Sequence, residues 1–192
     1  MHDFKALVRS VWERSFDGEN RRYHRFRTAD SGSTLVADCI GSNLRCAHEW
    51  GWCEGILDDP SAGRLVSPDE IVNRAKDCDA TAVRVTGMEP VMHDRHLLQL
   101  AETIPESMTL RIETNGMLLG GAYMRALTDR CDCHVRLSFK GSDPEQFSKL
   151  ARVDQRYFQN QVQSFHAIRK AECSIELALA GVYDEEDAKK LG

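Results

Sequence analysis

The sequence contains no run of about 20 apolar residues, the length that a helix needs to span a bilayer. Its first fifteen residues, MHDFKALVRSVWERS, are too charged for a secretion signal. Positive charge is not in excess either: the formal net charge is −5, so no overall field favours nucleic acid or an anionic membrane surface. These absences predict a cytoplasmic protein without a membrane or nucleic-acid partner.

Internal repeats, low-complexity segments and linkers are also lacking, which favours a single domain over residues 1–192. Hydrophobic residues make up 42% and charged residues 29%, an ordinary globular balance. Within that domain we expect residues 1–33 to form an N-terminal extension and residues 184–192 to form a tail.

Five short apolar runs predict buried strands, and segments with helical spacing separate the later ones. The runs are TLVAD (34–38), AVRVT (82–86), TLRIE (109–113), HVRLSF (134–139) and SIELAL (174–179). Strands that alternate with helices are typical of an α/β fold with a parallel sheet or a barrel segment.

Helices are expected at four places between these strands. Ser67, Pro68 and Glu70 form a capping box that predicts a helix start. Three further helices are predicted by spacing at 96–100, 122–127 and 158–168. Residues 51–66 are expected to be a loop because of their Gly, Asp and Pro content.

Loops rich in Gly, Pro and polar residues follow the first four predicted strands. They contain GSNLRC, TGMEP, TNG and KGSDPE in chain order. Ligands gather at the carboxyl ends of the strands in parallel α/β folds, so we expect these loops to open on one face and form the site.

The chain has seven cysteines, an odd number, and lacks the features of a small secreted scaffold, so a disulfide framework is not expected. Cys39, Cys46 and Cys53 follow the first predicted strand at the spacing Cys-x6-Cys-x6-Cys. Three alternatives stay open for them: an iron–sulfur cluster at this unusual spacing, zinc with His48 as a fourth ligand, or no ligand, with Cys39 at the end of a buried strand.

Two further motifs have simpler interpretations. Cys131 and Cys133, with His134, suggest a metal site, but Cys-x-Cys is too short to be specific, so we expect a helix-to-strand turn with one buried sulfur. Cys173 is expected to be a small buried apolar residue. The basic stretch 21–27 is expected to be a solvated or barrel-edge segment.

Five motifs occur in an order and spacing that resemble a known family. They are YHRFR (23–27), ADCIGSNLRC (37–46), VTGMEP (85–90), ETNG (113–116) and SFKGSDPEQF (138–147). Together they resemble the radical S-adenosylmethionine superfamily, in particular small archaeal-type relatives of glycyl-radical-enzyme activases. The resemblance runs from about Tyr23 to about Tyr183, most of the chain.

This resemblance implies an incomplete (β/α) barrel of about five to six parallel strands. It also implies a [4Fe–4S] cluster held by a Cys-x3-Cys-x2-Cys loop, with S-adenosylmethionine bound to the open iron and cleaved to a 5′-deoxyadenosyl radical. The three cysteine positions of that loop fall at Ser42, Cys46 and Glu49 of this chain. A cluster iron prefers thiolate, so the standard cluster lacks two of its standard ligands here.

The remaining site residues are assigned through the same resemblance. The family's Gly-Gly-Glu-Pro motif, whose backbone helps to receive the amino group of S-adenosylmethionine, appears as Gly87, Met88, Glu89 and Pro90. Glu113, Thr114 and Asn115 match a region that often contacts the ribose, and Ser138 and Lys140 match polar positions at the next strand end. His48 occupies a usually aromatic position close to the adenine.

Two functions follow as alternatives. One is radical chemistry with S-adenosylmethionine and a rearranged cluster at Cys39, Cys46 and Cys53. The other is a catalytically inactive relative that binds a nucleotide or a protein partner in a regulatory or scaffold role. Because only five strands are predicted, we expect a second copy or a partner protein to cover the open barrel edge. The sequence does not indicate the substrate, small molecule or protein.

Overall fold

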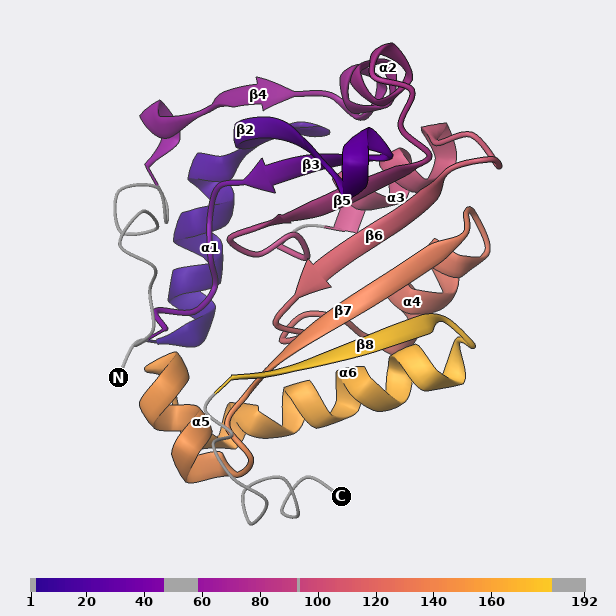
Figure 1. The fold of residues 1–192 in the computed structure, drawn as a ribbon. Helices are drawn as coiled ribbons and strands as arrows, with labels where there is room; N and C mark the ends of the chain where they lie inside the picture. Colours follow the sequence, from indigo (N-terminus) through magenta and orange to yellow (C-terminus); the bar gives the residue numbers. More distant parts are fainter. Residues whose placement is uncertain (1–2, 47–58, 93, 181–192) are drawn as a thin grey trace.

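The computed structural model describes residues 3–46, 59–92 and 94–180. In that part of the chain eight strands form one sheet in the order β1-β2-β3-β5-β6-β7-β8, with β4 paired to β2 (Figure 1). The strands are β1 Phe16–Asp17, β2 Asn20–Ala29, β3 Thr34–Cys39, β4 Arg64–Val66, β5 Ala82–Gly87, β6 Thr109–Thr114, β7 Cys133–Lys140 and β8 Ser174–Ala180.

Six α-helices and three short 3-10 turns connect these strands in the described ranges. The helices are α1 Phe4–Ser15, α2 Pro68–Asp77, α3 Asp94–Thr103, α4 Gly121–Thr128, α5 Pro144–Ala151 and α6 Phe158–Lys170. The 3-10 turns are η1 Asp30–Gly32, η2 Pro60–Ala62 and η3 Gln155–Tyr157.

The predicted fold class is confirmed. Strands β3, β5, β6, β7 and β8 are parallel to one another, and each contains one of the five apolar runs. The open, mostly parallel sheet has the form of an incomplete (β/α) barrel. Half of the predicted capping box is present: the Ser67 hydroxyl accepts a hydrogen bond from the Glu70 amide at 3.2 Å, whereas the Glu70 carboxylate pairs with Arg64 and Arg74.

Two predicted loops are wrong in part. Within 51–66, the described residues include η2 and β4, and β4 pairs with β2 across more than forty residues of chain, a contact that local composition does not reveal. The KGSDPE segment ends as a loop at Asp143, whose carboxylate caps α5 by accepting the Gln146 amide at 2.9 Å. Helix α1 was not predicted at all.

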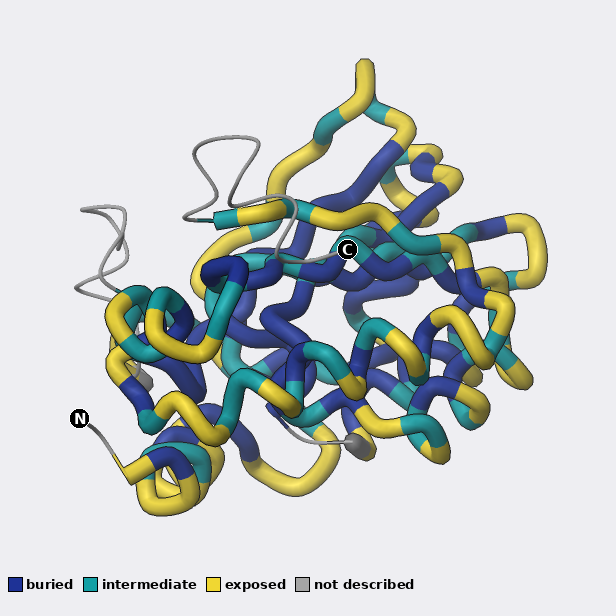
Figure 2. Tube along the Cα trace, turned by 90° about the horizontal axis from the view of Figure 1, so that it is seen from below, coloured by how far each residue is buried: buried dark blue, intermediate teal, exposed yellow. Residues whose placement is uncertain are grey.

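The main core lies between the sheet and helices α2, α3, α4 and α6. Leu35, Ala37 and Cys39 of β3 belong to this core, as do Val83 and Val85 of β5. Figure 2 shows the buried residues concentrated in the interior strands and on the inward sides of the helices.

Helices α1 and α5 lie beyond the carboxyl ends of the parallel strands (Figure 1). Phe4 of α1 and Phe147 of α5 pack with Leu44 and Met117, which belong to the loops after β3 and β6. The N-terminal segment is therefore packed against the loops that the sequence assigns to the site.

Strand β8 ends the described sheet. It pairs with β7, and Leu177 and Leu179 are 45% and 41% exposed. That a second copy or a partner protein covers this edge stays a prediction. No helix in the described ranges has both the length and the apolar character to cross a membrane.

Gly87, at the carboxyl end of β5, should not tolerate a larger side chain. Its φ is +97°, and an added Cβ would lie 2.7 Å from the Cys39 amide nitrogen. We expect Gly87→Ala to lower the free energy of unfolding by about 1–3 kcal/mol in urea titrations, because the backbone of β3 must shift. Gly121→Ala is the matched control, since its nearest neighbour is Arg125 Nη1 at 3.7 Å; equal losses in both variants would contradict this explanation.

Candidate functional site at the carboxyl ends of the strands

The loops after β3 and β5 are held together by their backbones. The Met88 amide donates to the Cys39 carbonyl at 3.1 Å, and the Glu89 amide donates to the Gly41 carbonyl at 3.0 Å. The GMEP segment therefore lies beside the GSNLRC segment, as the predicted loop cluster requires.

The carboxylate of Glu89 joins this pair to a third loop. Glu89 is only 1% exposed. Its Oε1 accepts from the Val91 amide at 2.8 Å and from the Thr114 hydroxyl at 2.5 Å, and its Oε2 accepts from the Asn115 amide at 2.8 Å. Burial raises the pKa of Glu89, while these donors and the charge of Arg21 oppose the rise.

Arg21 of β2 also binds the loops after β3 and β5. Its guanidinium is fully buried and donates to the carbonyl oxygens of Glu89 at 2.6 Å, Ile40 at 3.1 Å and Pro90. The ring of Phe16 lies 4.9 Å from the guanidinium carbon. Arg21 thus binds the backbone at the start of the first loop and within the GMEP segment.

Asn115 extends the network to the first and fourth loops. The side-chain amide of Asn115 donates to Asn43 Oδ1 at 2.7 Å. The backbone carbonyl oxygen of Asn115 accepts from Gln161 Nε2 at 2.6 Å. Gln161 of α6 also accepts the Lys140 amide at 3.1 Å. The Nδ2 group of Asn43 is buried and has no hydrogen-bond partner within the described part of the chain.

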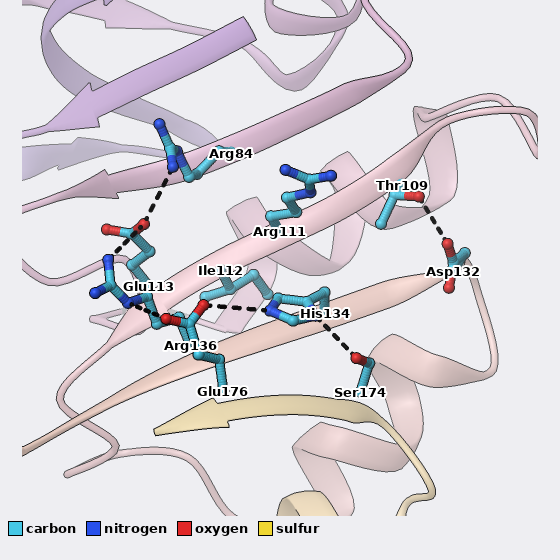
Figure 3. Close-up of a pocket in the computed structure, with 10 residues that line it drawn as sticks. All are labelled: Arg84, Thr109, Arg111, Ile112, Glu113, Asp132, His134, Arg136, Ser174 and Glu176. Carbon is cyan, nitrogen blue, oxygen red and sulfur yellow. Dashed lines mark hydrogen bonds and ion pairs between the residues drawn. The ribbon is translucent and has the colours of Figure 1, made fainter. Parts of the chain in front are cut away.

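Glu113 lies where this network meets the concave face of the sheet, the face opposite the helices (Figure 3). Its Oε2 accepts from the Thr86 hydroxyl at 2.6 Å, and its Oε1 is 3.6 Å from both Arg84 Nη1 and Arg136 Nη1. Ser138 and Lys140 are half-buried on β7, with the Lys140 ammonium 2.7 Å from the Ser138 hydroxyl.

The predicted metal ligands are not brought together in the part of the chain that is described. Cys39 is fully buried and points into the main core, where burial raises the pKa of its thiol to about 11. Cys46 is half-buried and packs beside the cluster formed by α1 and α5. Cys53, His48 and Glu49 lie outside the described residues. Among residues 3–46, 59–92 and 94–180, no three His, Cys, Asp or Glu side chains are placed to hold a metal, so the zinc interpretation gains no support there.

The second cysteine group lies at the opposite, amino ends of the strands. Cys133 begins β7, and Cys173, immediately before β8, donates from its thiol to the Cys133 carbonyl at 3.0 Å. Both are buried, as expected for structural sulfur, and Cys131 lies in the turn that precedes them.

Three residues of the site were missed in the sequence. Arg21 was grouped with a basic stretch, although it shares the two-residue period of Tyr23, which is also buried. Asn43 lies inside the first loop but was passed over in favour of the cysteines. Gln161 carries no signal, because α6 looks like an ordinary core helix.

A family model described as the Radical SAM superfamily matches residues 42–191. No curated protein matches the chain. Among solved structures, the crystal structure of Streptococcus suis SuiB bound to S-adenosylmethionine aligns with 83% of this chain at 16% identity and a TM-score of 0.57. The alignment covers 34% of the SuiB chain, so this chain spans about a third of that protein.

Removing the charge of Glu89 should loosen the loop cluster. We expect Glu89→Gln to lower the free energy of unfolding by about 1–3 kcal/mol, because an amide NH₂ placed at either oxygen faces a buried donor instead of accepting from it. Urea unfolding measures the change. Glu13→Gln, at an exposed position of α1, is the control; a loss no larger than that of the control would show that the carboxylate does not hold the loops.

Proposed function

Because the chain belongs to the radical S-adenosylmethionine superfamily, we propose that it binds S-adenosylmethionine at the carboxyl ends of β3, β5, β6 and β7. The observation that carries this proposal is the buried carboxylate of Glu89, which joins the GMEP loop to Thr114 and Asn115. These are the segments that the family resemblance assigns to the amino group and the ribose. The fold supports the proposal further, because SuiB shares it and its structure is of the form bound to S-adenosylmethionine.

Each segment has a chemical role in this proposal. The backbone of 87–90 receives the amino group of the ligand. Glu113 accepts hydrogen bonds from the ribose diol, since a carboxylate has about four acceptor sites and Glu113 uses one of them for Thr86. Ser138 and Lys140 supply a hydroxyl and an ammonium at the next strand end.

The residues present fit S-adenosylmethionine in one further respect. A buried amide donor without a partner is costly, and native structures usually satisfy such groups with protein, water or a ligand. Asn43 Nδ2 is such a donor in the first loop, one residue after the first family cysteine position. A polar ligand at the carboxyl ends would satisfy it.

The residues do not fit the family's [4Fe–4S] cluster in the same way. Ser42 Oγ accepts the Leu44 amide at 3.2 Å and belongs to the local turn, and Cys39 points into the apolar core. Two of the family's three cysteine positions are Ser42 and Glu49, whose oxygens are harder ligands for iron than thiolate. We therefore propose that this chain binds S-adenosylmethionine without the standard three-cysteine cluster, in the regulatory or scaffold role expected of a catalytically inactive relative.

Iron-free protein should bind S-adenosylmethionine in isothermal titration calorimetry. We expect Glu113→Gln to weaken this binding about tenfold, because the ribose loses a charged acceptor. Glu145→Gln, a control at an exposed carboxylate of α5, should bind as the wild type does. No heat of binding in the wild type, or the same affinity in all three proteins, would count against the site.

Restoring the family cysteines tests the second half of the proposal. After anaerobic reconstitution with iron and sulfide, we expect the double variant Ser42→Cys, Glu49→Cys to hold about four irons per chain and the wild type to hold none. The double alanine variant at the same positions controls for the loss of the native side chains. About four irons in the wild type, with an electron paramagnetic resonance signal that S-adenosylmethionine changes, would establish a rearranged cluster and overturn the proposal of cluster-free binding.

A further inference from the structure

The concave face of the sheet carries a group of arginines that the proposed S-adenosylmethionine site does not use. Arg84, Arg111 and Arg136 come from β5, β6 and β7. Since Val83 and Val85 point into the core, Arg84 between them points to the opposite face. These three side chains line a hollow of about 500 Å³, together with Glu113, His134 and Glu176 (Figure 3).

The arginines of this hollow have carboxylates at ion-pair distance, but the N–H donors of Arg84 and Arg136 are not all hydrogen-bonded. Arg84 and Arg136 share the single carboxylate of Glu113, each at 3.6 Å, which is beyond hydrogen-bond distance. Nε of Arg84 is buried and has no hydrogen-bond partner in the described part of the chain. The Nε–H of Arg84 is therefore a donor that no group in the described residues accepts.

The other charged groups around the hollow pair with its arginines or with neighbouring side chains. Glu176 is 3.1 Å from Arg136 Nε and 4.0 Å from His134 Nε2. Asp132 accepts from the Thr109 hydroxyl at 2.7 Å. Arg111 is 3.1 Å from Asp30, which is itself about half exposed at the rim.

A neighbouring pair of arginines on β2 shows hydrogen-bonded pairing with a carboxylate on the same sheet. Arg25 and Arg27 both reach the buried carboxylate of Asp38, at 2.6 Å and 3.2 Å. Arg25 and Arg27 thus hydrogen-bond to their carboxylate, whereas Arg84 and Arg136 stand too far from Glu113 to do so.

We propose that this hollow binds the anionic part of a second small molecule, a carboxylate or phosphate group held by Arg84, Arg111 and Arg136. Guanidinium groups match the paired oxygens of carboxylates and phosphates and bind them with charge-assisted hydrogen bonds. That this molecule binds together with S-adenosylmethionine rests on the proposed function. The hollow lies close to that site, because Arg84 precedes Gly87 by three residues, about 10 Å along a strand.

Calorimetric titration of the full chain with pyrophosphate and, separately, with citrate tests this inference without S-adenosylmethionine. We expect the wild type to bind at least one of the two anions, and Arg84→Gln and Arg111→Gln each to weaken that binding about tenfold. Arg125→Gln, at an exposed position of α4, should leave it unchanged. Binding of pyrophosphate alone assigns a phosphate group, and binding of citrate alone assigns a carboxylate.

Glu113→Gln should change the affinity for the anion in the direction opposite to the arginine variants. A misfolded variant would lose affinity and could not give this result. Removing the carboxylate that pairs with Arg84 and Arg136 should strengthen anion binding, although the same change weakens binding of S-adenosylmethionine. No binding of either anion by the wild type, or an equal loss in Arg125→Gln, would overturn the inference. Binding of an anion without binding of S-adenosylmethionine would contradict the proposed function but support the anion site. Binding of S-adenosylmethionine without binding of an anion would support the proposed function and contradict the anion site.

Discussion

Two buried charges, the guanidinium of Arg21 and the carboxylate of Glu89, hold the carboxyl ends of the strands in one arrangement. Burying either group is costly unless its hydrogen bonds are satisfied. Arg21 donates to three backbone carbonyls and Glu89 accepts from two amides and a hydroxyl, and nearly all of these partners lie on loops. The loops therefore cannot separate without leaving a charge unpaired in the interior, which makes this geometry stable even where the segments have little regular structure.

None of these interactions uses a thiolate. The contacts between the first three loops come from backbone groups and from the side chains of Arg21, Glu89 and Asn115. Such a network holds these loops together without a metal ligand. Packing of α1 against Leu44 and Met117 adds an apolar support that is also independent of a metal.

The five parallel strands were predictable because each is a short apolar run, although β8 at the edge is not buried, and the start of α2 was predictable from local capping chemistry. Strand β4 was not, because its three residues gain their structure only by pairing with distant β2. The motif residues of the site were found through their spacing, whereas Gln161 and Arg21 act through tertiary contacts that no local pattern encodes. Cys39 illustrates the same limit: the sequence left open whether it is a metal ligand or the buried end of a strand, and the structure places its side chain in the core.

Strand alternation also explains how an acidic protein acquires a local cluster of arginines. The net charge of −5 describes the whole chain, whereas the field in a hollow depends on the few groups that face it. On β5, β6 and β7, residues that point to the helices are apolar, so the charged residues of these strands are all directed to the concave face. Glu113 lies on this face and belongs to the motif that we propose binds the ribose, so its carboxylate links the proposed nucleotide site to the arginine-lined hollow.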